Sequence, residues 1–130
     1  MDNFPTIMIV DDDNLVSELL NTFLQREGYR VIMARDGTSA LGLLQVCSPD
    51  LILMDLIMPG INGVALLSVV RRHSQVPIIM ISAISEPSFV QKSLADGADD
   101  YVTKPFKLPV LKASIEALLN KSGFYAAARE

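Results

Sequence analysis

The sequence predicts an α/β fold in which a doubly wound parallel sheet is covered by helices on both faces. Two observations support this prediction: five short apolar segments recur along the chain, and segments with the apolar spacing of helices separate them. Alternation of this kind, joined by right-handed crossovers, gives one parallel sheet between two layers of helices. The length of 130 residues fits a single domain.

The short apolar segments are predicted to be strands, because each is too short for a helix and rich in Ile, Val or Leu. They span residues 7–10, 29–34, 51–54, 77–81 and 100–102. The first, third and fourth are apolar at consecutive positions rather than at alternate ones. Such runs are typical of strands that are buried on both faces of a parallel sheet.

The segments between these strands have apolar residues three or four positions apart, as in helices that bury one face. The first such stripe consists of Leu15, Leu19, Leu20, Phe23 and Leu24. Asp13 precedes this helix and is expected to be its N-cap. The last helix is expected over residues 108–121, where Pro109 suits the first turn.

The composition excludes several classes of protein. Half of the residues are hydrophobic and 20% are charged, with a mean hydropathy of +0.34, so the chain is not disordered. A single cysteine, Cys47, and a single histidine, His73, exclude a disulfide framework and a Cys/His zinc site. No apolar run reaches the roughly 18 residues of a membrane helix, and the N-terminus lacks signal-peptide features, so we expect a cytoplasmic protein. The net charge of −4 argues against a nucleic-acid-binding surface.

Polar residues follow four of the five predicted strands. They are Asp11, Asp12 and Asp13 after the first strand, Asp55 after the third, Ser82 after the fourth, and Thr103 and Lys104 after the fifth. Ligands of open α/β sheets bind beyond the carboxyl ends of the strands. The sequence therefore predicts a site there that contains carboxylates, a hydroxyl group and a lysine.

This set of side chains favours phosphoryl transfer. Three neighbouring carboxylates repel one another, and a hard divalent cation such as Mg²⁺, which prefers oxygen ligands, offsets that repulsion. Such a cation also polarises an incoming phosphoryl group, which a carboxylate attacks to form an aspartyl phosphate. Lys104 would then pair with one phosphate oxygen, and Ser82 would donate a hydrogen bond to another.

Taken singly, each residue also has a purely structural explanation. An aspartate after a strand is usually a helix N-cap, a lone lysine is usually solvated, and a strand-end serine usually bonds locally. Asp50, Asp99 and Asp100 are expected in turns or on the surface. Five of the residues are expected at one end of one sheet, and this joint placement favours a functional site over the structural explanations. They are Asp11, Asp12, Asp55, Ser82 and Lys104.

Four segments resemble the motifs of bacterial two-component response-regulator receiver domains, of the chemotaxis-regulator type. They are residues 7–13 (Ile-Met-Ile-Val-Asp-Asp-Asp), 53–63, 77–83 and 97–106. The resemblance covers about residues 5–120 and implies a flavodoxin-like, five-stranded sheet of order 2-1-3-4-5 flanked by five helices. It also implies a cis peptide bond between Lys104 and Pro105. We expect a receiver domain over residues 1–121 and a C-terminal tail, or the start of a linker, over 122–130.

The resemblance implies a role for each site residue. Asp55 would accept the phosphoryl group. Mg²⁺, the implied cofactor, would be held by Asp11, Asp12, Asp55 and the backbone carbonyl of Ile57, with Asp11 acting largely through water. Lys104 would pair with the phosphoryl group.

Ser82 and Tyr101 stand at the positions of the family's switch residues. On phosphorylation, Ser82 would turn toward the phosphoryl group and Tyr101 would turn inward, which reshapes the face formed by the fourth helix, the fifth strand and the fifth helix. The implied partners are a histidine kinase or histidine phosphotransfer protein and an output domain or target protein, without direct binding of nucleic acid or membrane. A phosphorylation-dependent dimer also fits, although the last helix lacks the arginines found in winged-helix transcription-factor receivers.

Two other functions remain as alternatives. One is a phosphorylation-independent interaction module of the same fold. The other is a haloacid-dehalogenase-like phosphohydrolase, which needs a second aspartate two residues after the nucleophile, where this chain has Ile57. We therefore expect no enzyme activity beyond the chain's own phosphorylation and dephosphorylation. A dinucleotide-binding domain is excluded, because the first strand leads into three acidic residues instead of a glycine-rich turn.

Overall fold

The computed structural model describes residues 4–58 and 60–123, in which five strands alternate with five helices. The strands are β1 (Thr6–Val10), β2 (Arg30–Ala34), β3 (Leu51–Asp55), β4 (Ile78–Ser82) and β5 (Asp100–Thr103). The helices are α1 (Asn14–Arg26), α2 (Gly37–Leu44), α3 (Gly63–Arg71), α4 (Pro87–Ala95) and α5 (Leu108–Lys121). Each predicted strand is present with its ends shifted by at most one residue, and the last helix has the predicted bounds.

All neighbouring strands are parallel, in the order β2-β1-β3-β4-β5 that the resemblance implied. From β1 the chain first adds β2 on one side and then β3 on the other. The strand order therefore reverses between β1 and β3, and the carboxyl ends of these two strands lie side by side at the switch point.

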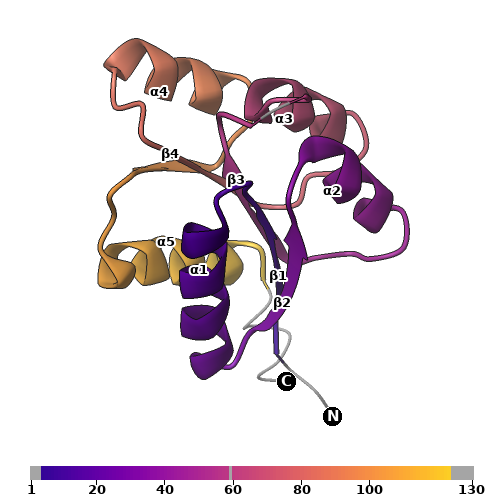
Figure 1. The fold of residues 1–130 in the computed structure, drawn as a ribbon, viewed down its shortest axis with the longest axis vertical. Helices are drawn as coiled ribbons and strands as arrows, with labels where there is room; N and C mark the ends of the chain where they lie inside the picture. The colour runs from indigo at the N-terminus through magenta and orange to yellow at the C-terminus, as the bar shows by residue number, and fades with distance from the viewer. Residues whose placement is uncertain (1–3, 59, 124–130) are drawn as a thin grey trace.

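The sheet is buried on both faces by helices. Ile9, Leu53 and Ile81 belong to the cluster formed with α1 and α5. Their neighbours along the strands, such as Met54 and Met80, pack with α2 and α3 on the other face, where α4 also lies (Figure 1). Every residue of β3 and β4 is buried. Burial on both faces explains why the strands are continuous apolar runs in the sequence. It also holds the ends of these strands in fixed positions.

The prediction for the buried face of α1 is wrong at its outer positions. Leu15 is 83% exposed and Leu19 is 51% exposed, whereas the buried residues of α1 are Ser17, Leu20 and Leu24. These three residues are three and four positions apart and share one face of the helix. The leucines of α1 thus occupy two faces, and contact with the sheet selects only one of them.

Arg71, at the end of α3, ties the loops that lead into β4 and β5. Its Nη2 lies 2.9 Å from Asp99 Oδ2, and its Nε donates to the carbonyl of Gly97 at 2.9 Å. Asp99 Oδ2 also accepts from the backbone N–H of Ile78 at 2.8 Å. Asp99, predicted only as a turn or surface residue, is therefore also a structural acceptor at the end of the sheet opposite the site.

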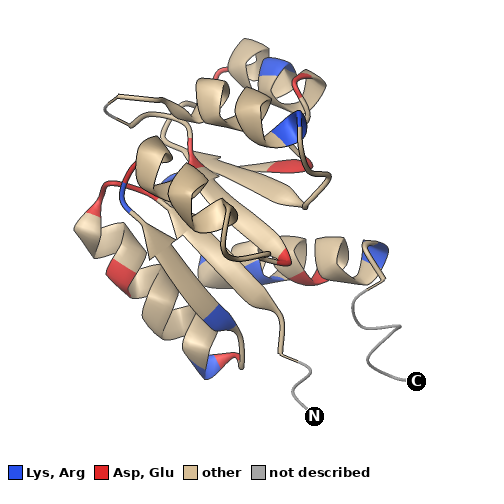
Figure 2. Cartoon of the chain, turned by 90° about the vertical axis from the view of Figure 1, so that its right-hand side faces the viewer, with Lys and Arg blue, Asp and Glu red and all other residues tan. Residues whose placement is uncertain are grey.

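The charges on the surface and the lengths of the helices bear on the expectations for nucleic-acid and membrane binding. Figure 2 shows basic residues scattered among acidic ones over the described part of the chain, rather than gathered on one face. Within residues 4–58 and 60–123, none of the helices has the length and apolar character needed to cross a membrane. A tail is expected over residues 122–130, and its residues 124–130 lie outside the described residues. Pro59 also lies outside them.

Candidate functional site

Three carboxylates lie together at the switch point of the sheet. Asp11 and Asp12 follow β1 and Asp55 ends β3, and each offers an oxygen within 4.8 Å of the others. Among the described residues, this is the one group of three or more His, Cys, Asp or Glu side chains placed so closely. Asp11 and Asp55 are buried and Asp12 is exposed, so the cluster opens to solvent on one side.

Lys104 reaches this cluster from the end of β5. Its Nζ lies 3.0 Å from Asp11 Oδ2 and 3.3 Å from Asp55 Oδ2, so one ammonium group pairs with both buried carboxylates. Its backbone N–H donates to the carbonyl of Ser82 at 2.7 Å, and its bond to Pro105 is cis, as expected. Burial opposes the charge on Lys104, but the hydrogen bonds and charges of Asp11 and Asp55 prevail and raise its pKa.

Asp55 is destabilised as a carboxylate. Burial raises the pKa of Asp55, and the negative charge of Asp11 raises it further. The hydrogen bond from the Ile57 N–H to Asp55 Oδ1, 3.2 Å long, and the Lys104 ammonium only partly offset this. A divalent cation nearby would favour the ionised form of Asp55. The site offers hard oxygen ligands and excess negative charge, and both fit Mg²⁺. Asp11, Asp12, Asp55 and the Ile57 carbonyl are the groups that would hold it.

The loop between β3 and α3 returns close beneath Asp55. A Cβ atom on Gly63 would overlap the carbonyl oxygen of Asp55, so glycine is required by this close approach. Asn62 caps α3, because its Oδ1 accepts from the N–H of Ala65 at 3.0 Å. This cap was not predicted from the sequence, although an Asn one residue before a helix is a recognised capping signal.

The first carboxylate segment is also fixed by a helix cap. Asp13 Oδ1 accepts from the N–H groups of Leu15 at 2.9 Å and Val16 at 3.3 Å, so the predicted N-cap is confirmed. The N–H of Asp13 in turn donates to Asp11 Oδ1 at 2.9 Å. The start of α1 therefore helps to orient the buried carboxylate of Asp11.

Ser82 and Tyr101 both meet the loop that follows β4. Ser82 is fully buried, and its Oγ accepts from the N–H of Ile84 at 3.1 Å. Tyr101 is half-buried, and its hydroxyl donates to the carbonyl of Ile84 at 2.6 Å. The two residues expected to act as switches are thus connected through the backbone of one loop residue.

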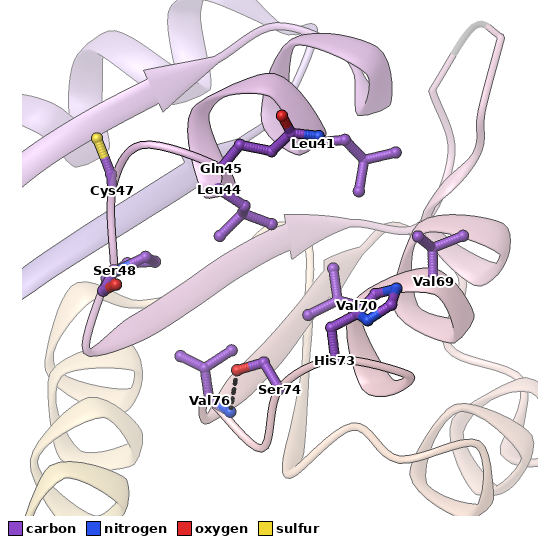
Figure 3. Close-up of a pocket in the computed structure, with 11 residues that line it drawn as sticks. Leu41, Leu44, Gln45, Cys47, Ser48, Val69, Val70, His73, Ser74 and Val76 are labelled. Atoms are coloured by element: carbon purple, nitrogen blue, oxygen red, sulfur yellow. Dashed lines mark hydrogen bonds between the residues drawn. The ribbon is translucent and has the colours of Figure 1, made fainter.

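A separate hollow of about 620 Å³ lies between α2 and α3, beside the segments that lead into β3 and β4 (Figure 3). It is thus at the opposite end of the sheet from the carboxylates. The eleven described residues that line it include no carboxylate. Cys47, after α2, and His73, after α3, lie well apart in the close-up and form no common ligand set. We therefore place the functional site at the carboxylate cluster.

Because the pKa of Asp55 is raised, we predict that the stability of the metal-free protein depends on pH. Between pH 3.8, the ordinary pKa of this carboxyl group, and its raised folded value, the folded state holds a proton that the unfolded state has lost. Ionisation of Asp55 therefore lowers stability as the pH rises. With a chelator present, we expect Asp55→Asn to melt at a higher temperature than wild type at pH 7 and to lose this advantage toward pH 4.

Asp36 provides the contrast for this experiment. Hydrogen bonds from Ser39 lower the pKa of Asp36, so its ionised form stabilises the fold above pH 3.8. Asp36→Asn should therefore bring no gain at pH 7. An Asp55→Asn protein that melts at or below the wild-type temperature at pH 7 would contradict the prediction.

Comparison with known proteins shows the family to which this chain belongs. Residues 7–116 match the response regulator receiver domain family. The chain is 41% identical over 116 residues to the DNA-binding response regulator MtrA of Mycobacterium tuberculosis, which covers 89% of this chain and 51% of MtrA. It is also 41% identical over 117 residues to the transcriptional regulatory protein CseB of Streptomyces coelicolor, covering 90% of this chain and 50% of CseB. The chain thus spans about half the length of these curated relatives.

Solved structures give the same result. The Francisella response regulator 1452 receiver domain superposes with a TM-score of 0.87 at 30% identity, covering 91% of this chain and 98% of that one. The Vibrio cholerae chemotaxis protein CheY4 superposes with a TM-score of 0.84 at 31% identity, covering 89% and 99%. With a family match over most of its length and this fold, the chain belongs to the response regulator receiver domains of two-component systems.

Proposed function

We propose that this chain is a phosphoacceptor switch that receives a phosphoryl group on Asp55 from a histidine kinase or histidine phosphotransfer protein, with Mg²⁺ as cofactor. The observation that supports it is the joint placement of Asp11, Asp12 and Asp55 within 4.8 Å, with Lys104 paired to two of them. This arrangement supplies a nucleophile, oxygen ligands for a cation and a cationic partner for a phosphate oxygen.

The transfer itself requires one nucleophilic step. A carboxylate oxygen of Asp55 attacks the phosphorus of the donor, and the bond from phosphorus to the donor's histidine nitrogen breaks, with the electron pair staying on that nitrogen. Bound Mg²⁺ would neutralise charge on the phosphoryl oxygens. Lys104, which now pairs with Asp11 and Asp55, would turn its ammonium group to a phosphoryl oxygen.

We further propose that Ser82 and Tyr101 relay the phosphorylated state. Turning the Ser82 hydroxyl toward a phosphoryl group on Asp55 would release the N–H of Ile84. Tyr101 holds the carbonyl of the same residue, so the β4–α4 loop and the Tyr101 ring would move together. The face formed by α4, β5 and α5 would then change shape, which is the output of the switch.

The interaction module without phosphorylation remains the alternative. It explains the fold but not why a lysine and two buried carboxylates meet at the open edge of the sheet. The phosphohydrolase is disfavoured because Ile57, two residues after Asp55, has no group that transfers a proton. We therefore propose no activity on other substrates, only the chain's own phosphorylation and dephosphorylation.

The partners follow from the relatives and from the surface. MtrA is named a DNA-binding protein and is about twice as long as the matched region, so we propose an output domain or target protein that acts with this receiver. Leu15 and Leu19, both exposed, lie on the helix that begins beside the carboxylates. We propose that the phosphoryl donor docks on these two leucines. A cytoplasmic location, a phosphorylation-dependent dimer and the absence of direct nucleic-acid binding stay predictions.

Asp55 is predicted to be the site of phosphorylation. Incubation with acetyl phosphate and Mg²⁺ should add one phosphoryl group, measured by intact mass, because the small donor needs only the nucleophile and the cation. Asp55→Asn should abolish the addition. Asp50→Asn, a change at a carboxylate that instead accepts from the Thr6 N–H at 2.7 Å, should leave it intact. Full labelling of Asp55→Asn would show that another residue is the acceptor.

Mg²⁺ is predicted to stabilise the unphosphorylated protein, because it binds the folded carboxylate cluster and not the unfolded chain. With a dissociation constant of about 1 mM, about 10 mM Mg²⁺ adds roughly 1.4 kcal/mol. For a domain of this size, that raises the melting temperature by about 3–6 °C. Calcium should act in the same direction but more weakly, and sodium at matched ionic strength should do little.

Asp12→Asn distinguishes this site from a general salt effect. It should remove most of the Mg²⁺ shift, and it should raise the metal-free melting temperature because one repelling charge is gone. Lys104→Ala should impair phosphorylation while keeping more of the Mg²⁺ response than Asp12→Asn does. Equal Mg²⁺ shifts in wild type and Asp12→Asn would mean that the carboxylates do not hold the ion.

Leu15→Ser combined with Leu19→Ser is predicted to slow phosphoryl transfer from the partner kinase. Burying one leucine side chain contributes about 1.5 kcal/mol, so we expect a loss of about tenfold or more in the transfer rate. The rate with acetyl phosphate should not change, because that donor needs no docking surface. Val46→Ser, at an 81% exposed position at the other end of the sheet, is the matched control. Equal losses with both donors would contradict the docking proposal.

A further inference from the structure

We propose that Ser17 is a positioning residue for the metal-binding carboxylates, acting through the peptide group that joins Asp11 to Asp12. This inference rests on the Mg²⁺ site of the proposed function. It starts from one contact: the Ser17 Oγ donates to the backbone carbonyl of Asp11 at 3.3 Å, between two buried residues.

Every polar atom of Asp11 has a partner in the structure. Its N–H donates to the carbonyl of Ala34 at 3.1 Å, and its Oδ1 accepts from the N–H of Asp13 at 2.9 Å. Its Oδ2 pairs with Lys104 Nζ at 3.0 Å. The Ser17 hydroxyl supplies the fourth contact, to the carbonyl oxygen. Asp11 is therefore held by β2, by the segment that follows β5, by the turn after β1 and by α1.

Ser17 is the polar member of the buried face of α1. The buried residues of this helix are Ser17, Leu20 and Leu24, and Ser17 is only 5% exposed. A buried hydroxyl group is costly unless it is hydrogen-bonded. Helical serines usually return their hydroxyl to a carbonyl three or four residues earlier. The Ser17 hydroxyl instead bonds to a carbonyl six residues earlier, outside the helix, at the end of β1.

The position of this contact determines what it orients. The carbonyl of Asp11 belongs to the planar peptide unit that runs from the Cα of Asp11 to the Cα of Asp12. A hydrogen bond to that carbonyl restrains rotation of the unit and therefore the directions of both acidic side chains. The contact from Lys104 to Asp11 is the one that the proposed phosphoryl transfer would break, whereas the contact from Ser17 is independent of Lys104. Ser17 thus holds the acidic pair when Lys104 moves to the phosphoryl group.

Ser17→Ala and Ser93→Ala form a matched pair that tests the inference. Both serines are 5% exposed in helices, but Ser93 lies in α4 and makes no hydrogen bond through its side chain to the segment of Asp11 and Asp12 among those that the structure gives. The dissociation constant of Mg²⁺ is measured for each protein from the dependence of the melting temperature on Mg²⁺ concentration. Ser17→Ala is expected to weaken Mg²⁺ binding by about 3- to 10-fold, at or below the lower end of the loss seen when an outer partner of a metal site is removed.

The metal-free melting temperature separates positioning from simple destabilisation. Ser17→Ala leaves the buried Asp11 carbonyl without this partner and should lower the metal-free melting temperature, an effect that is partly offset because alanine favours a helix more than serine does. The dissociation constant of Mg²⁺ is obtained relative to each protein's own metal-free melting temperature, so its increase in Ser17→Ala reports positioning and not stability. Ser17→Thr, which keeps the hydroxyl group, should recover affinity. Ser93→Ala should bind Mg²⁺ as wild type does.

Two results would overturn the inference in different ways. If wild type responds to Mg²⁺ and Ser17→Ala has the same affinity as Ser93→Ala, Ser17 has no positioning role and the proposed function stands. If wild type itself shows no Mg²⁺ response, the proposed metal site fails and the inference fails with it.

Discussion

Asp11, Asp12 and Asp55 repel one another across less than 4.8 Å at the edge of an apolar sheet, and the surrounding structure compensates for that repulsion. Burial and the negative charge of Asp11 together raise the pKa of Asp55. Lys104 neutralises part of the charge by pairing with two of the carboxylates. We propose that three acids held together in this way bind a divalent cation, which would stabilise the folded protein.

The sheet withstands this repulsion because its central strands are anchored along their whole length. Every position of β3 and β4 is buried, and helices cover both faces of the sheet. The loop beneath Asp55 is fixed by the close approach of Gly63, and Asp11 is held at each of its polar atoms. Such rigid positioning would let the carboxylates act on a phosphoryl group with little reorganisation of their own.

The helix α4, which belongs to the face that we propose to change shape, buries fewer of its residues than α3 does. Ser93 is the buried residue of α4, whereas α3 buries Leu66, Leu67 and Val70. At one end of α4, the Ile84 backbone bonds to Ser82 and Tyr101, and beyond the other end Arg71 bonds to the Gly97 carbonyl. A helix with little buried surface between two hydrogen-bonded ends is suited to shift when the contacts at one end change.

The strands, and the edge of the sheet at which the candidate site lies, could be predicted from the sequence alone. Continuous apolar runs reveal strands buried on both faces, and the carboxyl ends of parallel strands share one edge, so the places of Asp11 and Asp55 follow from their positions after such runs. Local signals of the same kind located the cap at Asp13, and the cap at Asn62 was equally readable.

The contacts between these residues could not be predicted from the sequence, because they depend on how distant segments pack. The bond from Lys104 to Asp11 joins residues 93 positions apart, and the ion pair of Arg71 with Asp99 joins residues 28 positions apart. A pattern of neighbouring residues does not show which residues so far apart in the sequence will come into contact. The spacing of leucines in α1 likewise fits two faces of the helix, and contact with the sheet buried Ser17 while leaving Leu15 exposed. Side-chain direction depends on which surfaces meet in three dimensions, and that is settled when distant segments pack together.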